Sequence, residues 1–171
     1  GTTEYRITID YVVDRFSKTA IRKCKPLIRC ILRMSTYQIL YMDSVPDSAA
    51  CNEAVKLAKR HGFASLSGFV NGVLRNIARN KDNIEYPSET EDMATYLSVR
   101  YSTPVWLVKK MMKDYQGQAE DILRGTFAER DTTIRVNLCR TTKAELKKML
   151  IDAGIHVQDG VYDENALRIH G

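Results

Sequence analysis

Residues 45–59 read VPDSAACNEAVKLAK and residues 68–76 read GFVNGVLRN, and these two stretches decide the fold. In the first, Pro46 and Asp47 favour a helix start, because proline needs no amide partner in the first turn and a carboxylate is attracted to the positive end of the helix dipole. Small apolar side chains then recur at helical spacing until a basic turn and Gly62, which are typical of a helix end. The first stretch therefore predicts one well-bounded helix.

The second stretch lies in a helix expected over residues 66–80. Its inward face is apolar and consists of Leu66, Phe69, Val70, Val73, Leu74 and Ile77. A second face carries two glycines and two arginines at helical spacing, namely Gly68, Gly72, Arg75 and Arg79. We expect the glycines to allow close packing of another helix, and contact with RNA is the alternative.

Two further helices are expected before these stretches. In the first, apolar side chains repeat at helical spacing at Ile9, Val12, Val13 and Phe16. The second starts at Pro26 and is apolar nearly all round as far as Met42, which is typical of a central, buried helix. Its one polar strip consists of Arg29, Arg33 and Thr36 on the helix, and of Arg22 if the helical phase extends backward. Residues 1–85 are therefore predicted to form an all-α domain.

The pattern changes beyond residue 85. A polar segment leads to Ser88 and Glu91, which have the spacing of a capping box. Two helices are expected after it, one following Pro104 and one with apolar positions at Ala119, Ile122, Leu123 and Phe127. We expect residues 86–130 to form a helical linker region.

Residues 131–171 predict a partial α/β subdomain. Alternation of polar and apolar residues over 133–138 indicates a half-buried strand. Thr142 and Glu145 have the spacing of a second capping box, and Gly154 ends the helix that they begin. Short strands are then expected at 155–157 and 167–169. The fold class is therefore mainly α, with a small α/β part at the end.

Positive charge is concentrated in the first half of the chain. The formal net charge is +5, and residues 1–85 contain 14 Lys and Arg against 8 Asp and Glu. Between Arg15 and Arg33 there are seven basic residues and no acidic one. Such a run has affinity for polyanions, because each phosphate that it neutralises releases condensed counterions. A solvated helix face is the common alternative, and charge alone does not distinguish RNA, DNA and a membrane surface.

Composition excludes several classes of protein. The chain is 44% hydrophobic and 27% charged, as is usual for a globular domain. No apolar run reaches the roughly 20 residues that a membrane span needs, and no signal-peptide pattern is present. The four cysteines show no CxxC pair and no metal-ligand spacing to a histidine, so we expect free thiols in a reducing cytoplasm.

The two stretches quoted first resemble the paired signature of the NusB-like helical domain. That domain occurs as the free transcription antitermination factor and as the N-terminal domain of the 16S ribosomal RNA cytosine-5 methyltransferases of the Sun, Fmu or RsmB family. Residues 26–33 (PLIRCILR) resemble the methyltransferase form of the central helix, and Arg75 stands where antitermination factors tend to carry an acidic residue. Residues 102–107 and 134–137 resemble the methyltransferase linker and the start of its pre-catalytic, RNA-recognition-like subdomain.

The resemblance implies a region that binds and positions ribosomal RNA for a separate catalytic domain. In that family a Rossmann-like domain follows, with a glycine-rich loop for S-adenosylmethionine and catalytic cysteines in Pro-Cys and Thr-Cys-Ser contexts. The cysteines here, Cys24, Cys30, Cys51 and Cys139, have neither context. We therefore expect no cofactor site and no methyl transfer in this chain. Its expected partners are ribosomal RNA and the protein's own C-terminal methyltransferase domain.

The resemblance also implies a helical hairpin upstream of Gly1, so this chain is expected to be a fragment at both ends. An apolar face left bare favours self-association. We expect the fragment to form dimers or to exchange an element.

Seven basic residues are the candidate RNA-binding residues: Arg22, Lys23, Lys25, Arg29, Arg33, Arg75 and Arg79. A guanidinium suits phosphate because its planar fork binds two oxygens at once. The alternative is pairing with acids such as Asp43, Asp47 and Glu53, but eight acids cannot neutralise fourteen bases. An antitermination-type module, whose RNA affinity depends on a ribosomal protein, is the alternative function. A purely structural interaction module is a third.

Other polar and aromatic residues have two interpretations each. Three polar residues beside core positions are expected to tie helix ends together, namely Asn52, Glu53 and Asn71. Trp106 is expected to anchor a core, with base stacking as the alternative. Arg135 and Asn137 share a strand face, where contact with RNA and packing against a catalytic domain are both open.

Overall fold

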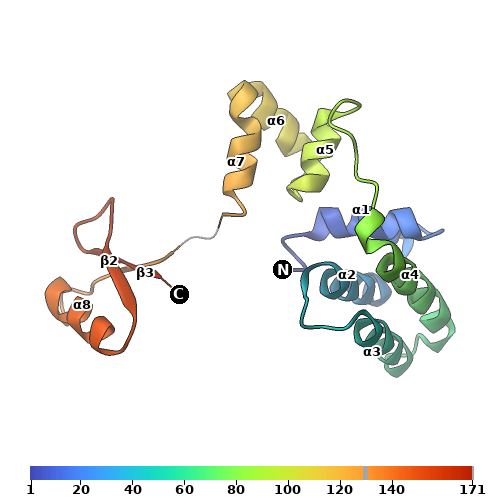
Figure 1. Ribbon diagram of the computed structural model, residues 1–171, viewed down its shortest axis with the longest axis horizontal. Coiled ribbons are helices and arrows are strands. Elements are labelled where there is room, and N and C mark those ends of the chain that lie inside the picture. The colour runs from blue at the N-terminus through green and yellow to red at the C-terminus, as the bar shows by residue number, and fades with distance from the viewer. Residues whose placement is uncertain (129–130, 171) are drawn as a thin grey trace. The chain divides into compact units, whose positions relative to one another are not determined.

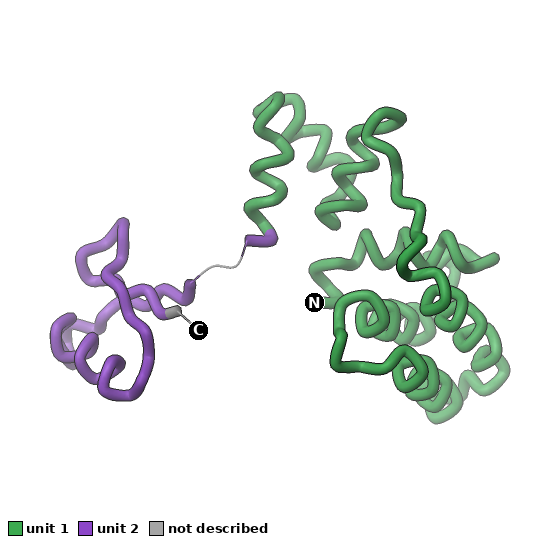
Figure 2. The backbone as a smooth tube through the Cα atoms, viewed as in Figure 1, with its two compact units in different colours: residues 1–126 green, residues 127–171 purple. Residues whose placement is uncertain are grey.

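The computed structural model describes residues 1–128 and 131–170. The chain divides into two compact units, Gly1–Thr126 and Phe127–Gly171 (Figure 2). The first unit is helical, and the second combines one helix with a small sheet (Figure 1). Of the residues expected to form a linker (86–130), residues 86–126 belong to the helical unit, and 129–130 lie outside the described residues.

Four helices form the core of the first unit. They are α1 (Arg6–Phe16), α2 (Pro26–Tyr41), α3 (Asp47–Arg60) and α4 (Ser67–Asn80). Helix α2 packs against the other three, so the prediction of a central helix is confirmed (Figure 1). Its buried side chains include Ile28 and Leu32, which meet Leu74 and Ile77 of α4 in one apolar cluster.

The boundaries of α3 agree with the signals in its sequence. Pro46 occupies the N-cap position, and Asp47 lies in the first turn, where its carboxylate favours the dipole. The helix ends at Arg60, and Gly62 adopts a positive φ of 83°. Glycine tolerates that conformation without steric cost, so the predicted C-terminal signal is confirmed.

Short 3-10 helices connect the longer elements of the first unit. They are η1 (Ile21–Lys23), η2 (Ala64–Leu66), η3 (Lys81–Asn83) and η4 (Gln116–Gln118). The backbone amide of Ile21 donates to Asp14 Oδ1 at 2.6 Å, which fixes the turn between α1 and α2.

Three further helices complete the first unit: α5 (Met93–Arg100), α6 (Val105–Tyr115) and α7 (Ala119–Gly125). Helices α6 and α7 confirm two predictions, although α7 ends before Phe127. Helix α5 was not predicted, and the capping box expected at Ser88 and Glu91 is wrong. Asp92 caps α5 instead, because its carboxylate stands directly before the unpaired first-turn amides and accepts from those of Ala94 and Thr95.

The second unit contains β1 (Thr132–Arg135), α8 (Lys143–Asp152), β2 (His156–Asp159) and β3 (Ala166–His170). The strands lie in the order β1-β3-β2, and both pairings are antiparallel. Helix α8 packs on β2. Thr142 and Glu145 form the predicted capping box. The strand predicted over 133–138 is too long, because the Asn137 side chain accepts from the amide of Cys139 and starts a turn.

Candidate nucleic-acid interface

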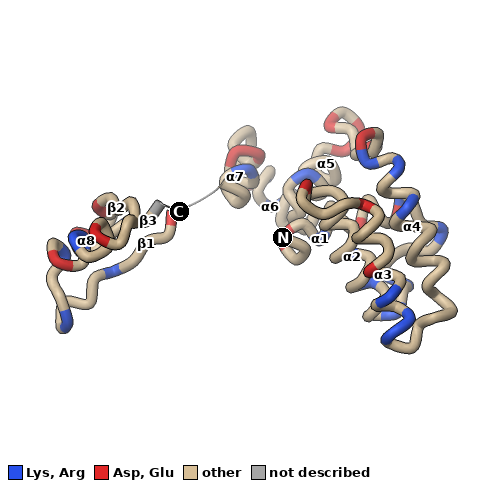
Figure 3. The backbone as a smooth tube through the Cα atoms, turned by 60° about the horizontal axis from the view of Figure 1, so that its bottom comes forward, with Lys and Arg blue, Asp and Glu red and all other residues tan. Residues whose placement is uncertain are grey.

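The outer face of α4 is open to solvent. Within residues 1–128 and 131–170, a Cβ atom placed on Gly68 or on Gly72 would meet no atom of another element within 4 Å. For these residues, the prediction that the glycines allow close packing of another helix is therefore wrong. Arg75 and Arg79 are exposed on the same helix. Figure 3 marks the basic positions of α4 in blue. We call Gly68, Gly72, Arg75 and Arg79 the open face of α4.

Arg75 is held in place by its own helix. Its Nε atom donates to Asn71 Oδ1 at 3.0 Å, one turn earlier. This hydrogen bond uses the Nε–H group of the guanidinium, and the N–H groups of the two terminal nitrogens are donors that a ligand can use. Asn71 was expected to join a network between helix ends, and the structure gives it this local role instead. The relevant signal in the sequence is an amide four residues before an arginine.

A shallow cavity of about 280 Å³ lies between α3 and the open face of α4. Arg75 and Arg79 line one side of it, and Asp47, Ser48 and Cys51 of α3 line the other. Burial raises the pKa of the Cys51 thiol, the charge of Arg75 lowers it less, and Asp47 raises it further. Cys51 is therefore a neutral thiol at neutral pH, and it contributes an apolar surface to the cavity rather than a nucleophile.

The one carboxylate in this cavity is already paired. Asp47 Oδ2 lies 2.9 Å from Lys81 Nζ. This contact raises the pKa of Lys81, chiefly through the hydrogen bond to Asp47. Because Lys81 compensates the charge of Asp47, the two arginines keep a net attraction for anions. Lys81 was not among the predicted site residues, since only the fold brings it to Asp47.

Three of the predicted basic residues lie at another part of the helical unit. Arg22 and Lys23 belong to η1, and Lys25 directly precedes α2, and all three are exposed. Arg79 lies beside Asp47, which follows the other end of α2. A helix of 16 residues separates the two groups, or about 24 Å at 1.5 Å per residue. The seven candidates therefore do not form one patch.

Arg33 is part of an ion pair between α1 and α2. Its Nε and Nη2 atoms donate to the two carboxylate oxygens of Asp10 at 2.7 and 2.6 Å. The hydrogen bond to Asp10 raises the pKa of Arg33. Both side chains are mostly buried, with 21% and 26% of their surfaces exposed. The partner is thus Asp10 and not one of the acids expected from the sequence, and Asp10 occupies one edge of this guanidinium.

Arg29 does not lie on an open strip either. It is half-buried, and its Nε atom is enclosed without a hydrogen-bond partner among the described residues. A buried donor of this kind is costly. RNA contact by Arg29 or Arg33 stays untested, and the surface proposed below uses neither residue.

Two other expectations about polar and aromatic residues are corrected. Asn52 and Glu53 are exposed, and Glu53 pairs with Lys56 of the same helix at 2.7 Å, so they do not tie helix ends together. Trp106 keeps 68% of its surface exposed. Its expected role as a core anchor is wrong for the part of the chain that the structure describes.

In the second unit, Arg135 is exposed and lies 3.6 Å from the Asp163 carboxylate. Asn137 follows β1 in the turn described above, so the two do not share a strand face. RNA contact and packing against a catalytic domain stay alternative predictions for these two residues.

Neither a metal site nor a membrane-spanning helix is found in the part of the chain that the structure describes. Among the described residues, no group of His, Cys, Asp and Glu side chains could hold a metal ion. Within 1–128 and 131–170, no helix combines the length and apolar character needed to cross a membrane. The four cysteines are present as thiols.

Two regions of the chain match known protein families. Residues 1–79 match the NusB family, and residues 103–171 match the ferredoxin-like domain described as "Methyltr_RsmF/B-like". The chain therefore combines a region that matches the NusB family with a region that matches this ferredoxin-like domain.

Individual relatives match either the whole chain or its helical part. The chain is 36% identical over 170 residues to the probable ribosomal RNA small subunit methyltransferase B of Bacillus subtilis, covering 99% of this chain and 37% of that protein. It is 35% identical over 86 residues to the transcription antitermination protein NusB of Dictyoglomus thermophilum, covering 50% of this chain and 60% of that protein. The chain thus spans little more than a third of the length of the methyltransferase relative.

One solved structure shares the fold. The crystal structure of PH0851 superposes with a TM-score of 0.74 at 20% identity, and the match covers 98% of this chain and 37% of that one. The likeness extends over both units, which confirms the predicted fold class.

Proposed function

We propose that this chain is the ribosomal RNA binding and positioning region of a 16S ribosomal RNA (cytosine-5) methyltransferase. The observation that carries the proposal is the open face of α4, where two glycines without neighbours precede two exposed arginines. The similarity to ribosomal RNA small subunit methyltransferase B supports the choice of RNA as the ligand.

Glycines on an exposed helix face need a reason. Each destabilises a helix interior by about 0.8–1 kcal/mol relative to alanine. Packing against the described part of the chain does not explain them, because no atom of another element in that part lies within 4 Å of a Cβ placed on either glycine. Close approach of a ligand does, since a helix surface without Cβ atoms allows a sugar-phosphate backbone to lie against it. The arginines one and two turns further along are then placed to contact successive phosphates.

In this proposal the chemistry of methyl transfer belongs to another domain of the same protein. S-adenosylmethionine and the nucleophilic cysteine would act there, on a cytosine that this region helps to present. The raised pKa of Cys51 supports this division, because a thiol that attacks cytosine needs a lowered one.

The proposal is tested by reversing the charge of the open face. We expect the double variant Arg75→Glu, Arg79→Glu to bind helical fragments of 16S ribosomal RNA at least about tenfold more weakly than the parent at low salt, because two phosphate contacts become repulsive. Fluorescence anisotropy with labelled RNA gives the affinity, and circular dichroism checks that the helices remain.

A matched control is available on α6. Lys109 and Lys113 are also exposed and four residues apart, so changing both to Glu alters the net charge by the same amount. If this control loses as much affinity as the α4 variant, the effect comes from net charge and the open face is not the binding surface.

A NusB-type antitermination module is the second candidate, favoured by the match of residues 1–79 alone. In that case the chain would need a ribosomal-protein partner to bind RNA firmly. Tight binding by the isolated chain supports the methyltransferase role, and binding only after a partner is added supports the antitermination role.

Two partners remain proposals. We expect the protein's own methyltransferase domain to contact this region, and we expect the isolated fragment to dimerise. Light scattering over a wide concentration range tests the second point, and a constant monomer mass contradicts it.

A further inference from the structure

We propose that a tyrosine-walled cavity in the helical unit binds one unstacked base of the RNA. This inference rests on the proposed function, because it assumes that the chain binds RNA. The cavity has a volume of about 320 Å³, which falls within the range of small-ligand pockets. Its walls come from the end of α2, the segment after η3, and α5.

Aromatic rings form most of the wall. Tyr41, Tyr86 and Tyr96 line the cavity, and Pro87 and Val99 add apolar surface between them. Every base has two flat faces that stack on such rings irrespective of sequence. The wall is therefore suited to a planar ring and does not require a particular base.

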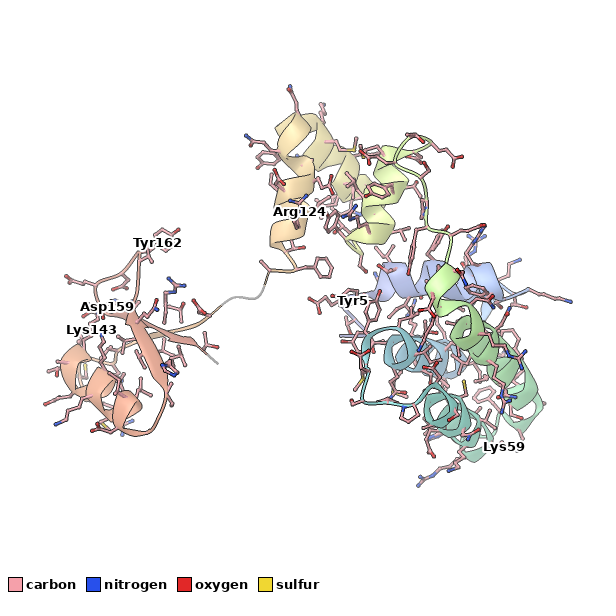
Figure 4. All side chains as sticks on the ribbon, in the orientation of Figure 1. Tyr5, Lys59, Arg124, Lys143, Asp159 and Tyr162 are labelled. Atoms are coloured by element: carbon pink, nitrogen blue, oxygen red, sulfur yellow. The ribbon has the colours of Figure 1, made fainter. Side chains whose placement is uncertain are left out.

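Two of these rings, Tyr41 and Tyr86, pack against other tyrosine rings that do not line the cavity. Tyr41 packs on Tyr5, with ring centroids 4.5 Å apart, and on Tyr37, at 5.2 Å. Tyr5 is labelled in Figure 4 at the start of α1. Tyr86 stacks on Tyr11 with an angle of 19° between the rings. Because the supporting rings fix their orientation, a base would meet walls that are already formed.

The segment that carries Tyr86 is also anchored. The Tyr11 hydroxyl donates to the carbonyl of Glu85 at 2.9 Å. Arg15 pairs with the Glu85 carboxylate. Burial raises the pKa of Tyr86 and of Tyr41, so both phenols are neutral at physiological pH and would not repel a phosphate.

Arg100 makes a nucleotide a better fit than an apolar peptide side chain. It lines the cavity, and its guanidinium lies 5.4 Å from the Tyr96 ring centroid and 5.6 Å from that of Tyr101. About half of the Arg100 side chain is exposed, and its nearest carboxylate, Glu120, lies 3.9 Å away. A nucleotide brings both a ring for the tyrosines and a phosphate for this cation.

A second hollow connects the cavity, along the chain, with the proposed RNA surface. Met42 and Asp43, which follow Tyr41, line a second hollow together with Asp47 and Lys81. Asp47 also lines the cavity beside Arg75 and Arg79. One RNA strand that lies over Lys81 could therefore contact Arg75 and Arg79 of α4 and place a base of the same strand among the tyrosines.

The test compares two RNA hairpins that differ by one bulged nucleotide, the fluorescent base 2-aminopurine. We expect the 171-residue chain to bind the bulged hairpin about tenfold more tightly than the fully paired one, and to quench the 2-aminopurine emission, because stacking on an aromatic ring quenches it. Tyr86→Leu should remove most of the preference and the quenching, whereas Tyr86→Phe should keep both, since it keeps the ring.

Tyr115→Leu is the control, because Tyr115 is exposed outside the cavity. Equal binding of the two hairpins, or quenching that Tyr86→Leu leaves intact, overturns the inference and leaves the proposed function standing. Binding of neither hairpin contradicts the proposed function as well. If the cavity instead binds a peptide side chain, the parent chain will not quench the 2-aminopurine emission, and this outcome also overturns the inference.

Discussion

At the scale of single residues, arginines of similar sequence context have different roles. Arg33 and Arg75 both lie on helices in the basic first half of the chain. Arg33 is bound by the carboxylate of Asp10, whereas Arg75 is exposed to solvent. The difference depends on Asp10, which is 23 residues from Arg33 in the sequence. Local patterns cannot reveal such a partner, so a basic strip predicted from periodicity combined structural and solvent-facing residues.

Replacing Arg33 should therefore affect stability. We expect Arg33→Ala to lower the free energy of unfolding by about 2 kcal/mol, because a bidentate, charge-assisted contact is lost and Asp10 is left partly buried without its partner. Urea unfolding measures the change. Arg22→Ala, at an exposed position, should change it by less than about 0.5 kcal/mol. Equal effects would mean that the ion pair contributes nothing.

Gly72 should show opposite effects on stability and binding. Since a Cβ there meets no neighbour, Gly72→Ala should stabilise the protein by about 0.5–1 kcal/mol through helix propensity. The same methyl group would hold an RNA backbone away from α4, so affinity should fall. Thermal unfolding and RNA anisotropy on one sample test both points, and unchanged affinity in a stabilised variant contradicts the close-approach argument.

At the scale of elements, helices with clear start and stop residues in the sequence were predictable, and helices without them were not. Helices α2, α3 and α4 have regular apolar spacing and clear boundaries. Helix α5 is short, and one of its buried positions is the polar Ser98, whose hydroxyl donates to the Thr103 carbonyl at 2.6 Å. This hydrogen bond gives the buried hydroxyl a partner, but the partner is known only once the chain is folded, so the sequence pattern does not reveal the helix. For the same reason the exposure of Gly68 and Gly72 could not be predicted, because it depends on which helices are neighbours.

The capping box of α8 predicts a pH dependence in the second unit. The pKa of Glu145 is lowered, chiefly by its hydrogen bond from the Thr142 amide. A carboxyl whose pKa is lower in the folded state contributes stability that is present above its unfolded pKa and is lost as the pH falls through the folded one. Helix α8 should therefore weaken below the ordinary glutamate pKa of 4.5. Circular dichroism of residues 127–171 against pH measures this, and Glu145→Gln should reduce the change.

At the scale of the whole molecule, the chain consists of a helical unit with the proposed RNA surface and a small sheet unit of the ferredoxin-like kind. The fold class and the α/β region were predictable because each rests on residue spacing within one segment. The NusB-like region was predictable because residues 45–59 and 68–76 resemble that family's signature. The tyrosine cavity was not, since its walls come from segments as far apart in the sequence as Thr8 and Arg100.

The division of labour between domains gives a prediction for the chain itself. We expect this 171-residue polypeptide to show no one-to-one binding of S-adenosylmethionine in the micromolar range and no methyl transfer to RNA. Isothermal titration calorimetry checks the first point, and transfer of a labelled methyl group checks the second. A saturable site in the titration would contradict the assignment of the cofactor to another domain.

The central claim is that Arg75 and Arg79 on the open face of α4 contact RNA phosphates, and the salt dependence of binding tests it most directly. The slope of log affinity against log salt counts the phosphate contacts, at about 0.7–0.9 units each. We expect Arg75→Ala, Arg79→Ala to reduce the magnitude of this slope by roughly one to two units relative to the parent chain, and Lys109→Ala, Lys113→Ala to leave it unchanged. A slope that is the same in the parent and in the α4 variant would contradict the account.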